Sequence, residues 1–396
     1  MNNLPRSKSM RIRSMDVMRG MTLFLMLFVN DLYVDGVPQF LVHSEASVDA
    51  MGLADWVFPG FLFMVGMSVP YAMQAREKKG DTFGSLLGHV IIRSLSLLLI
   101  GVLILNGSQG DVQYIGFSKL IWLILIYICV FLVWNNYPKD QNRGMMYKVF
   151  RCIGILGICY LAYIFKDSQG NWLKTSWWGI LGLIGWGYFA SAVIYLISKG
   201  KMIPIGLAVL FFLLLNICSS AGISSLVISK MSFLSVLLSG NIPLIVCSGM
   251  FIGVWLQKQT HAKLLLKQLL LVAILCLATG FILRHWFILS KIYGTPSWAL
   301  VCNGISLLFF CLMYYLVDVL KLEKGFSLFE QAGRNSLTTY LAPDIIYYLL
   351  WSMPFSVQIY KQPDHMILAL MGSLLWAFVM LYLAIGLKKL NIHLKL

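Results

Sequence analysis

A single histidine stands in an acidic segment near the start of the chain. Between Asp31 and Asp55 the segment contains no Lys or Arg, and His43 is its only histidine. Imidazole titrates near neutral pH, so such a side chain can take a proton from a hydroxyl or an amine as a general base. The alternative is a loop histidine that only faces water. The acidic residues around it are Asp31, Asp35, Glu45, Asp49 and Asp55. We regard His43 as the first candidate catalytic residue.

Polar and aromatic residues flank this segment. Asn30 precedes it at the end of the first apolar stretch, where an amide is costly unless it is paired or faces water. Asp55 can cap the helix that follows, and Trp56 fits the aromatic belt of a membrane interface. Trp298, at the start of a later apolar stretch, is either a belt residue or a platform for a sugar ring. We therefore take Asn30 as a second catalytic candidate, and the substrate-binding candidates are Asp55, Trp56 and Trp298.

Basic residues gather at the opposite end of the apolar stretches. Arg13 and Arg19 flank Asp16 just before the first stretch, and Arg334 and Asn335 precede a late one. One interpretation is an anchor for lipid head groups. The other is a docking site for an anionic cofactor, because guanidinium groups bind phosphates well. We expect Arg334 at the start of a helix, where its charge opposes the helix dipole unless an anion is near.

The composition is that of a membrane protein. Of 396 residues, 59% are hydrophobic and 12% charged, about half the charged fraction of a soluble domain. The apolar residues come in blocks of about 20, the length a helix needs to cross a bilayer. The net charge of +15 is spread over many short connections, which argues against a nucleic-acid partner. All eight cysteines fall in apolar blocks without a CxxC pair, so neither disulfides nor a metal centre are indicated.

The apolar blocks predict an all-α fold, a polytopic integral membrane helical bundle of about 11–12 transmembrane helices. The block at 203–218 is short, and the stretch after it (219–239) has the character of a re-entrant or interfacial segment, so eleven spans is an alternative to twelve. The expected spans are 17–34, 55–75, 88–106, 117–134, 148–166, 176–197, 203–218, 240–257, 265–284, 298–318, 335–352 and 365–387.

The basic residues give the bundle a direction. Cytoplasmic loops are enriched in Lys and Arg, and with the N-terminus inside most of the 31 such residues fall on the inner side. The outer connections keep Lys119, Lys166, Lys174, Lys230, Arg284, Lys291 and Lys361. We expect both termini in the cytoplasm, a basic arm over 1–16, a transmembrane region over 17–387 with an outer loop at 31–54, and a tail over 388–396. The apolar run at 21–29 lacks a small-residue cleavage site, so we interpret it as a retained first helix.

Several motifs occur in a fixed order along the chain. The first is Arg13-Ser14-Met15-Asp16-Val17-Met18-Arg19-Gly20, followed by Phe28-Val29-Asn30, then His43, then Gly-Leu-Ala-Asp-Trp-Val-Phe-Pro-Gly-Phe-Leu-Phe over 52–63. Weaker pieces follow at 178–186, 291–298 and 333–340. In this order they resemble the heparan-α-glucosaminide N-acetyltransferase family, including its bacterial members. The first 70 residues are the most specific part.

The resemblance implies transfer of an acetyl group from cytoplasmic acetyl-CoA to an amino sugar on the far side of the membrane. It implies that His43 is the general base or acetyl carrier, with Asn30 close by, and that acetyl-CoA is the co-substrate without a metal. It also implies a bacterial inner membrane. Two departures leave the acceptor, and N- or O-acetylation, open: the interval from His43 to Asp55 is longer than usual, and the Trp that normally follows the histidine is absent.

Other classes of function fit parts of the pattern. A membrane transporter or flippase of the cell envelope would use polar groups to line a translocation path, typically with inverted repeats and paired broken helices. The sequence shows neither feature. A structural partner in envelope assembly is a third interpretation, and the sequence leaves a homodimer open. Binding of coenzyme A would separate the acyltransferase from the transporter.

Overall fold

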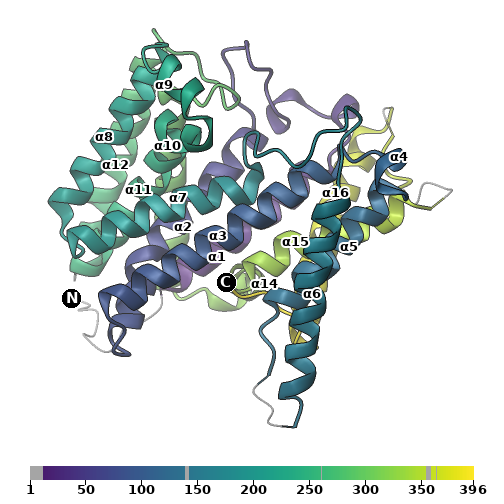
Figure 1. Ribbon diagram of the computed structural model, residues 1–396. Coiled ribbons are helices and arrows are strands. Elements are labelled where there is room, and N and C mark those ends of the chain that lie inside the picture. The colour runs from purple at the N-terminus through teal and green to yellow at the C-terminus, as the bar shows by residue number, and fades with distance from the viewer. Residues whose placement is uncertain (1–11, 139–141, 260, 354–357, 363) are drawn as a thin grey trace.

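The computed structural model describes residues 12–138, 142–259, 261–353, 358–362 and 364–396. Most of the basic arm expected over 1–16 therefore lies outside the described residues. Within them every regular element is a helix, and the β pairing consists of two isolated bridges. The expected all-α membrane fold is confirmed. Figure 1 shows long helices running between two ends of the molecule, with loops and short helices at each end.

All twelve expected spans coincide with helices. These are α1 (Arg13–Asp31), α2 (Leu53–Glu77), α3 (Phe83–Gly107), α5 (Lys119–Trp134), α6 (Gly144–Ile164), α7 (Gly179–Ser198), α8 (Met202–Ser220), α11 (Asn241–Lys258), α12 (Ala262–Leu283), α13 (Pro296–Met313) with its π-helical continuation η4 (Tyr314–Val319), α15 (Ser336–Trp351) and α16 (Met366–Lys389). In the described part of the chain, nine helices are long and apolar enough to cross a bilayer, α8 among them.

Three of the twelve helices fall short of that standard for identifiable reasons. Helix α1 carries Arg13, Asp16, Arg19 and Asp31, and α5 and α15 have 16 residues each. Their crossing of the membrane stays a prediction. The stretch after α8, where a re-entrant or interfacial segment is an alternative to a full span, forms the short helices α9 (Ser225–Lys230), η3 (Ser232–Leu234) and α10 (Ser235–Ser239).

We call the end of the bundle where α1 begins the inner end, and the end where α1 stops, at Asp31, the outer end. The segment after α1 contains two short 3-10 helices, η1 (Val34–Gly36) and η2 (Gln39–Leu41), and lies at the top of Figure 1 with α4 (Val112–Ile115), α9 and α10. Ile12 and Leu396 line one cavity, so both ends of the described chain are at the inner end. An even number of antiparallel passes explains this placement.

A helix that hydropathy did not predict lies at the inner end. Helix α14 (Glu323–Arg334) is amphipathic and packs on α1. The two cross at Gly20 and Gly333: a Cβ at Gly20 would collide with the carbonyl of Phe329, and one at Gly333 with the carbonyl of Asp16. Helices approach this closely only where small residues meet. The crossing fixes the start of α1 against the end of α14.

Candidate functional site

His43 and Asp55 meet at the outer end of the bundle. His43 lies in the segment between α1 and α2, and Asp55 lies in the first turn of α2. The Nδ1 atom of His43 is 2.7 Å from Oδ1 of Asp55. A carboxylate in this position accepts the Nδ1 proton, which leaves Nε2 as the basic nitrogen. The His43 side chain is 52% exposed and that of Asp55 is buried, so the pair presents its histidine to solvent.

The Asp55 carboxylate accepts two further hydrogen bonds besides its contact with the histidine. Its Oδ2 accepts hydrogen bonds from the backbone N–H groups of Ser44 and Gly52, each at 3.0 Å. Gly52 precedes the first residue of α2, so the same carboxylate satisfies a donor at the helix start. Three donors from three positions leave the carboxylate little freedom. Asp55 is thus a fixed support that orients the His43 ring.

The two candidate tryptophans are buried beneath this pair. Trp298 donates from Nε1 to the backbone oxygen of Asp55 at 3.2 Å and is 2% exposed. Trp56 donates from Nε1 to Oγ of Ser306 at 3.1 Å and is 6% exposed. Their rings are covered by the bundle and satisfied by internal hydrogen bonds. Contact of Trp56, Trp298 or Asp55 with a substrate stays a prediction. In this structure Asp55 supports the histidine, and Trp298 supports Asp55.

Lys291 completes the outer site. It lies in the segment between α12 and α13, and its Nζ is 3.3 Å from Nδ1 and 3.5 Å from Nε2 of His43. Nearly equal distances place the amine beside the ring rather than in line with one nitrogen. Nζ also donates to the backbone oxygen of Ala54 at 3.2 Å. Burial lowers the pKa of Lys291, although the charge of Asp55 acts in the opposite direction.

A second contact ties the His43 segment to the segment that carries Lys291. Arg284 donates from Nε to Oδ2 of Asp49 at 2.8 Å, and the backbone N–H of Leu289 donates to Oδ1 at 2.8 Å. Partial burial opposes ionisation, but these two donors hold the pKa of Asp49 below its usual value. Ser290 also donates to the backbone oxygen of Ala46 at 2.8 Å. The two segments therefore form one outer platform around His43.

Asn30 is not joined to His43 by a hydrogen bond in this structure. It is exposed at the outer end of α1, and its side chain has no hydrogen-bond partner among the described residues. Its neighbour Asp31 is fully buried, with Lys361 Nζ at 3.0 Å and the Tyr347 and Tyr360 hydroxyls at 2.6 and 2.8 Å. Sequence analysis missed this cluster. It anchors the end of α1 and so fixes the position of Asn30.

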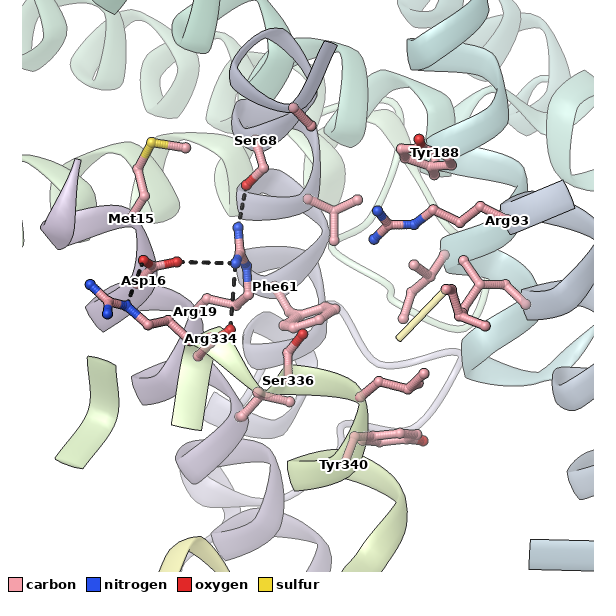
Figure 2. A pocket seen from close by; sticks show the side chains of 18 of the residues that line it. Met15, Asp16, Arg19, Phe61, Ser68, Arg93, Tyr188, Arg334, Ser336 and Tyr340 are labelled. Carbon is pink, nitrogen blue, oxygen red and sulfur yellow. Dashed lines mark hydrogen bonds and ion pairs between the residues drawn. The ribbon is translucent and has the colours of Figure 1, made fainter. Parts of the chain in front are cut away.

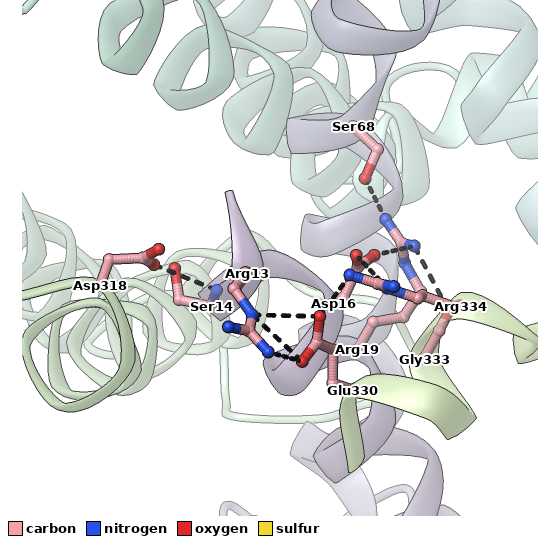
Figure 3. Close-up of polar contacts among 9 residues, drawn as sticks. All are labelled: Arg13, Ser14, Asp16, Arg19, Ser68, Asp318, Glu330, Gly333 and Arg334. Atoms are coloured by element: carbon pink, nitrogen blue, oxygen red, sulfur yellow. Dashed lines mark hydrogen bonds and ion pairs between the residues drawn. The ribbon is translucent and has the colours of Figure 1, made fainter. Parts of the chain in front are cut away.

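The inner end carries a dense set of ion pairs (Figure 3). Arg13 at the start of α1 pairs with Glu323 and, at 2.9 Å, with Glu330 of α14. The backbone N–H of Ser14 donates to Oδ2 of Asp318 at 3.1 Å. A carboxylate at this place satisfies a free donor and the positive end of the helix dipole. These contacts hold α1, η4 and α14 together.

Asp16 is the centre of the second half of this set. Arg19 reaches Asp16 Oδ1 at 3.3 Å, and Arg334 reaches Oδ2 at 3.4 Å. Arg19 also bonds to Ser68 of α2 and, at 3.4 Å, to the backbone oxygen of Gly333. Arg334 does precede a helix, since α15 begins two residues later at Ser336. It is also the last residue of α14, which was not expected, and there its charge favours the helix dipole. It pairs with Glu330 of that helix as well.

A cavity of about 590 Å³ opens beside this set (Figure 2). Its lining includes Asp16, Arg19, Ser68, Arg93, Tyr188, Arg334, Ser336, Tyr340 and Lys395, together with the apolar Leu23, Met26, Phe61, Val65, Ile184 and Leu337. Asp16, Arg334 and Lys395 lie at the inner end of the bundle, whereas Arg93 and Tyr188 lie near the middle of α3 and α7. Met26 and Phe61 lie closer to the outer ends of α1 and α2. The cavity thus has a cationic mouth and an apolar depth.

Only three of the five residues expected to bind a cofactor line this cavity. Asp16, Arg19 and Arg334 line it. Arg13 is turned toward the carboxylates of α14, and Asn335 is buried, where its Nδ2 donates to the backbone oxygen of Ala384 at 3.2 Å. Neither of these two residues lines the cavity, so their contact with a cofactor stays a prediction that the geometry does not favour.

Sequence analysis missed Arg93, which lines the same cavity from α3. Its guanidinium carbon lies 4.6 Å from the centre of the Tyr188 ring on α7, a cation–π contact. A signal was available, because Arg93 is an ionisable residue inside the expected span 88–106 and such residues face a bundle interior or a cavity. Lys395 belongs to the tail expected over 388–396, and hydropathy contains nothing that would place it at the cavity.

Comparison with known proteins finds similarity over part of the chain. No family model matches. Over 101 residues, 26% of this chain, it is 40% identical to heparan-alpha-glucosaminide N-acetyltransferase of Mus musculus, and over 96 residues, 24% of this chain, 40% identical to the protein of that name from Homo sapiens. These matches span 15% and 14% of the two relatives. The chain is therefore a membrane protein that is related, over about a quarter of its length, to heparan-alpha-glucosaminide N-acetyltransferase.

Proposed function

We propose that this chain is a transmembrane acetyltransferase that moves an acetyl group from acetyl-CoA to an amino sugar or another glycan acceptor. The observation that carries the proposal is the His43–Asp55 pair at one end of a bundle whose other end holds a cation-lined cavity. The partial similarity to an N-acetyltransferase supports the same activity. A general base and an anion-binding cavity at opposite ends suit transfer from a phosphorylated donor to a polar acceptor.

In this proposal acetyl-CoA occupies the inner cavity. Its phosphates face the guanidinium groups at the mouth, and its pantetheine arm runs along the apolar depth toward Met26 and Phe61. Phe61 follows Asp55 by six residues on α2, about 9 Å along the helix axis. A thioester that reaches Phe61 is therefore less than two helical turns from the carboxylate that supports His43.

His43 supplies the base. Its Nε2 removes a proton from the acceptor nitrogen or oxygen, which attacks the thioester carbon. The carbon–sulfur bond then breaks, the acetyl group stays on the acceptor, and the coenzyme A thiolate takes up a proton. Lys291 beside the ring and Asn30 at the end of α1 are the candidates to stabilise the developing oxyanion. In an alternative order, His43 Nε2 attacks the thioester carbon, the carbon–sulfur bond breaks and the coenzyme A thiolate leaves. The acceptor then attacks the acetyl group on Nε2 in a second step, which frees the histidine and releases the acceptor proton.

The membrane sidedness of the proposal follows from the basic residues. The inner end carries most Lys and Arg, so we assign it to the cytoplasm, where acetyl-CoA is made. The platform of His43 then faces the periplasmic side of a bacterial inner membrane. Lipids surround the bundle, and the exposed apolar side chains of α6 and α8 fit lipid contact.

The proposal is tested with the purified chain in lipid vesicles, acetyl-CoA and glucosamine. His43→Ala should abolish acetyl transfer and leave the thermal stabilisation by coenzyme A intact. His285→Ala is the matched control, because His285 is an exposed histidine at the same end and lies outside the Asp55 pair. Unchanged turnover in His43→Ala would refute the role of His43. A wild-type chain that coenzyme A does not stabilise would favour a transporter or flippase.

A further inference from the structure

The cations at the mouth of the cavity are not equivalent. Arg19 and Arg334 are already paired with Asp16, and Arg334 also with Glu330. Arg93 and Lys395 have no carboxylate within ion-pair distance in the described part of the chain. A buried Nε of Arg93 also lacks a hydrogen-bond partner there. A guanidinium N–H that faces a cavity without a hydrogen-bond acceptor destabilises the fold unless a ligand accepts the hydrogen bond.

Lys395 reaches this cavity because the last residues form an ordered strap. We call residues 390–396 the strap. Asn135 at the end of α5 holds it with two side-chain hydrogen bonds, donating to the oxygen of Asn391 at 3.2 Å and accepting from the N–H of His393 at 2.8 Å. The N–H of Leu394 donates to Oγ1 of Thr338 at 2.8 Å, and that of Lys395 donates to the oxygen of Trp134 at 3.0 Å.

These contacts make the strap part of the cavity wall. Leu394 is buried, and Leu394, Lys395 and Leu396 all line the cavity together with Ile12 and Arg93. Thr338 lies on α15, two residues after the cavity residue Ser336. A segment held by α5 and α15 at once keeps Lys395 at the mouth.

We propose that Arg93 and the strap form the phosphate site of the donor nucleotide, with Lys395 as its second cation and Asn135 as a positioning residue. This inference rests on the proposed function and deepens it. The charges of Arg19 and Arg334 are partly neutralised by their ion pairs with Asp16. An anionic ligand therefore binds most strongly to the two cations that have no carboxylate partner, Arg93 and Lys395. The Tyr188 ring packs under the Arg93 guanidinium and limits its freedom.

The test compares two donors, acetyl-CoA and S-acetylpantetheine, which lacks the whole 3′-phosphoadenosine diphosphate portion. Arg93→Ala and Lys395→Ala should each raise KM for acetyl-CoA roughly 10-fold, because a charge-assisted hydrogen bond is lost. KM for S-acetylpantetheine should stay unchanged. Lys389→Ala is the matched control, since Lys389 is exposed at the end of α16 and does not line the cavity. Arg93→Lys keeps a charge and should recover part of the acetyl-CoA affinity.

Asn135→Ala tests whether the position of the strap matters, because it loosens the strap without removing a charge. Asn135 does not line the cavity, yet its loss should weaken acetyl-CoA selectively, as Lys395→Ala does. Binding of adenosine 3′,5′-bisphosphate, which has no acyl group, should weaken in all three alanine variants. If the wild-type chain uses acetyl-CoA but Arg93→Ala and Lys395→Ala affect both donors equally, the phosphate site is wrong and the proposed function stands. If the wild-type chain neither binds nor uses acetyl-CoA, both are rejected.

Discussion

The Nδ1 atom of His43 lies 2.7 Å from Oδ1 of Asp55, and Asp55 accepts two further backbone hydrogen bonds. This relationship gives the histidine one tautomer and one orientation. Asp55→Asn keeps the shape of the side chain but removes the charge that favours Nδ1–H. We expect acetyl transfer to fall at least about 100-fold, with stabilisation by coenzyme A unchanged. Initial rates measured beside thermal unfolding curves check this, and a fall of less than a few-fold would show that the carboxylate does not orient the base.

Lys291 should set the alkaline limit of the reaction. Burial lowers its pKa from the ordinary value of 10.5. If the cationic form stabilises the oxyanion, the rate is full below that lowered pKa and is lost as the pH rises through it. Lys291→Arg keeps the cation to higher pH, so its alkaline limb should move upward. A pH–rate profile of both proteins measures this, and an identical limb in the two would exclude Lys291 from the titration.

The close crossing of α1 and α14 should require glycine at Gly20 and Gly333, because a side chain there would clash with the facing backbone. Gly333→Ala would push a methyl group into the Asp16 carbonyl, and we expect a loss of about 1–3 kcal/mol of unfolding free energy. Coenzyme A binding should weaken as well, because Asp16 and Arg334 shift. The matched control is Gly325→Ala on the same helix, where a Cβ meets no atom within 4 Å. Equal thermal stability of the two variants would contradict the account.

His393 should make the strap sensitive to acid. Burial, with the charges of Lys388 and Lys395, lowers the pKa of His393 from its ordinary value of 6.5. The folded form therefore favours neutral imidazole, whose Nε2 lies 2.9 Å from the amide nitrogen of Asn136. Its contribution to stability is full above about pH 6.5 and is lost as the pH falls through the folded pKa.

The strap's response to acid is measurable through coenzyme A binding. Between roughly pH 8 and pH 5, affinity should fall more steeply in the wild-type chain than in His393→Gln, whose amide cannot take up a proton. The comparison between the two proteins cancels the titration of the phosphates themselves. Parallel pH curves would remove His393 from the strap mechanism.

The sequence predicted the helices because the hydrophobic blocks have the length of a bilayer crossing, and all twelve blocks are helices here. It could not predict α14 in the same way. That helix is amphipathic and lies at the inner end, so its polar face hides it from a search for long apolar runs. For this reason the sequence predicts the start of α15 after Arg334 but not that Arg334 also ends α14.

The site was predictable only in part. His43 stood out as the sole histidine of an acidic segment, but the segment between it and Asp55 is irregular, so spacing alone gives no distance between them. Lys291 and Arg93 join their sites through contacts between segments far apart in the sequence, which no local pattern contains. The strap and the buried Asp31 cluster depend on the same long-range packing.

The most direct test of the central claim is a sided assay in sealed vesicles with the chain in one orientation. Acetyl-CoA labelled in the acetyl group is enclosed with the inner end of the chain, and glucosamine is added only on the side of His43. We predict labelled N-acetylglucosamine on the His43 side in the wild-type chain and none with His43→Ala. Labelled product that forms only when both substrates are on the same side, or that forms equally with His43→Ala, would contradict the account.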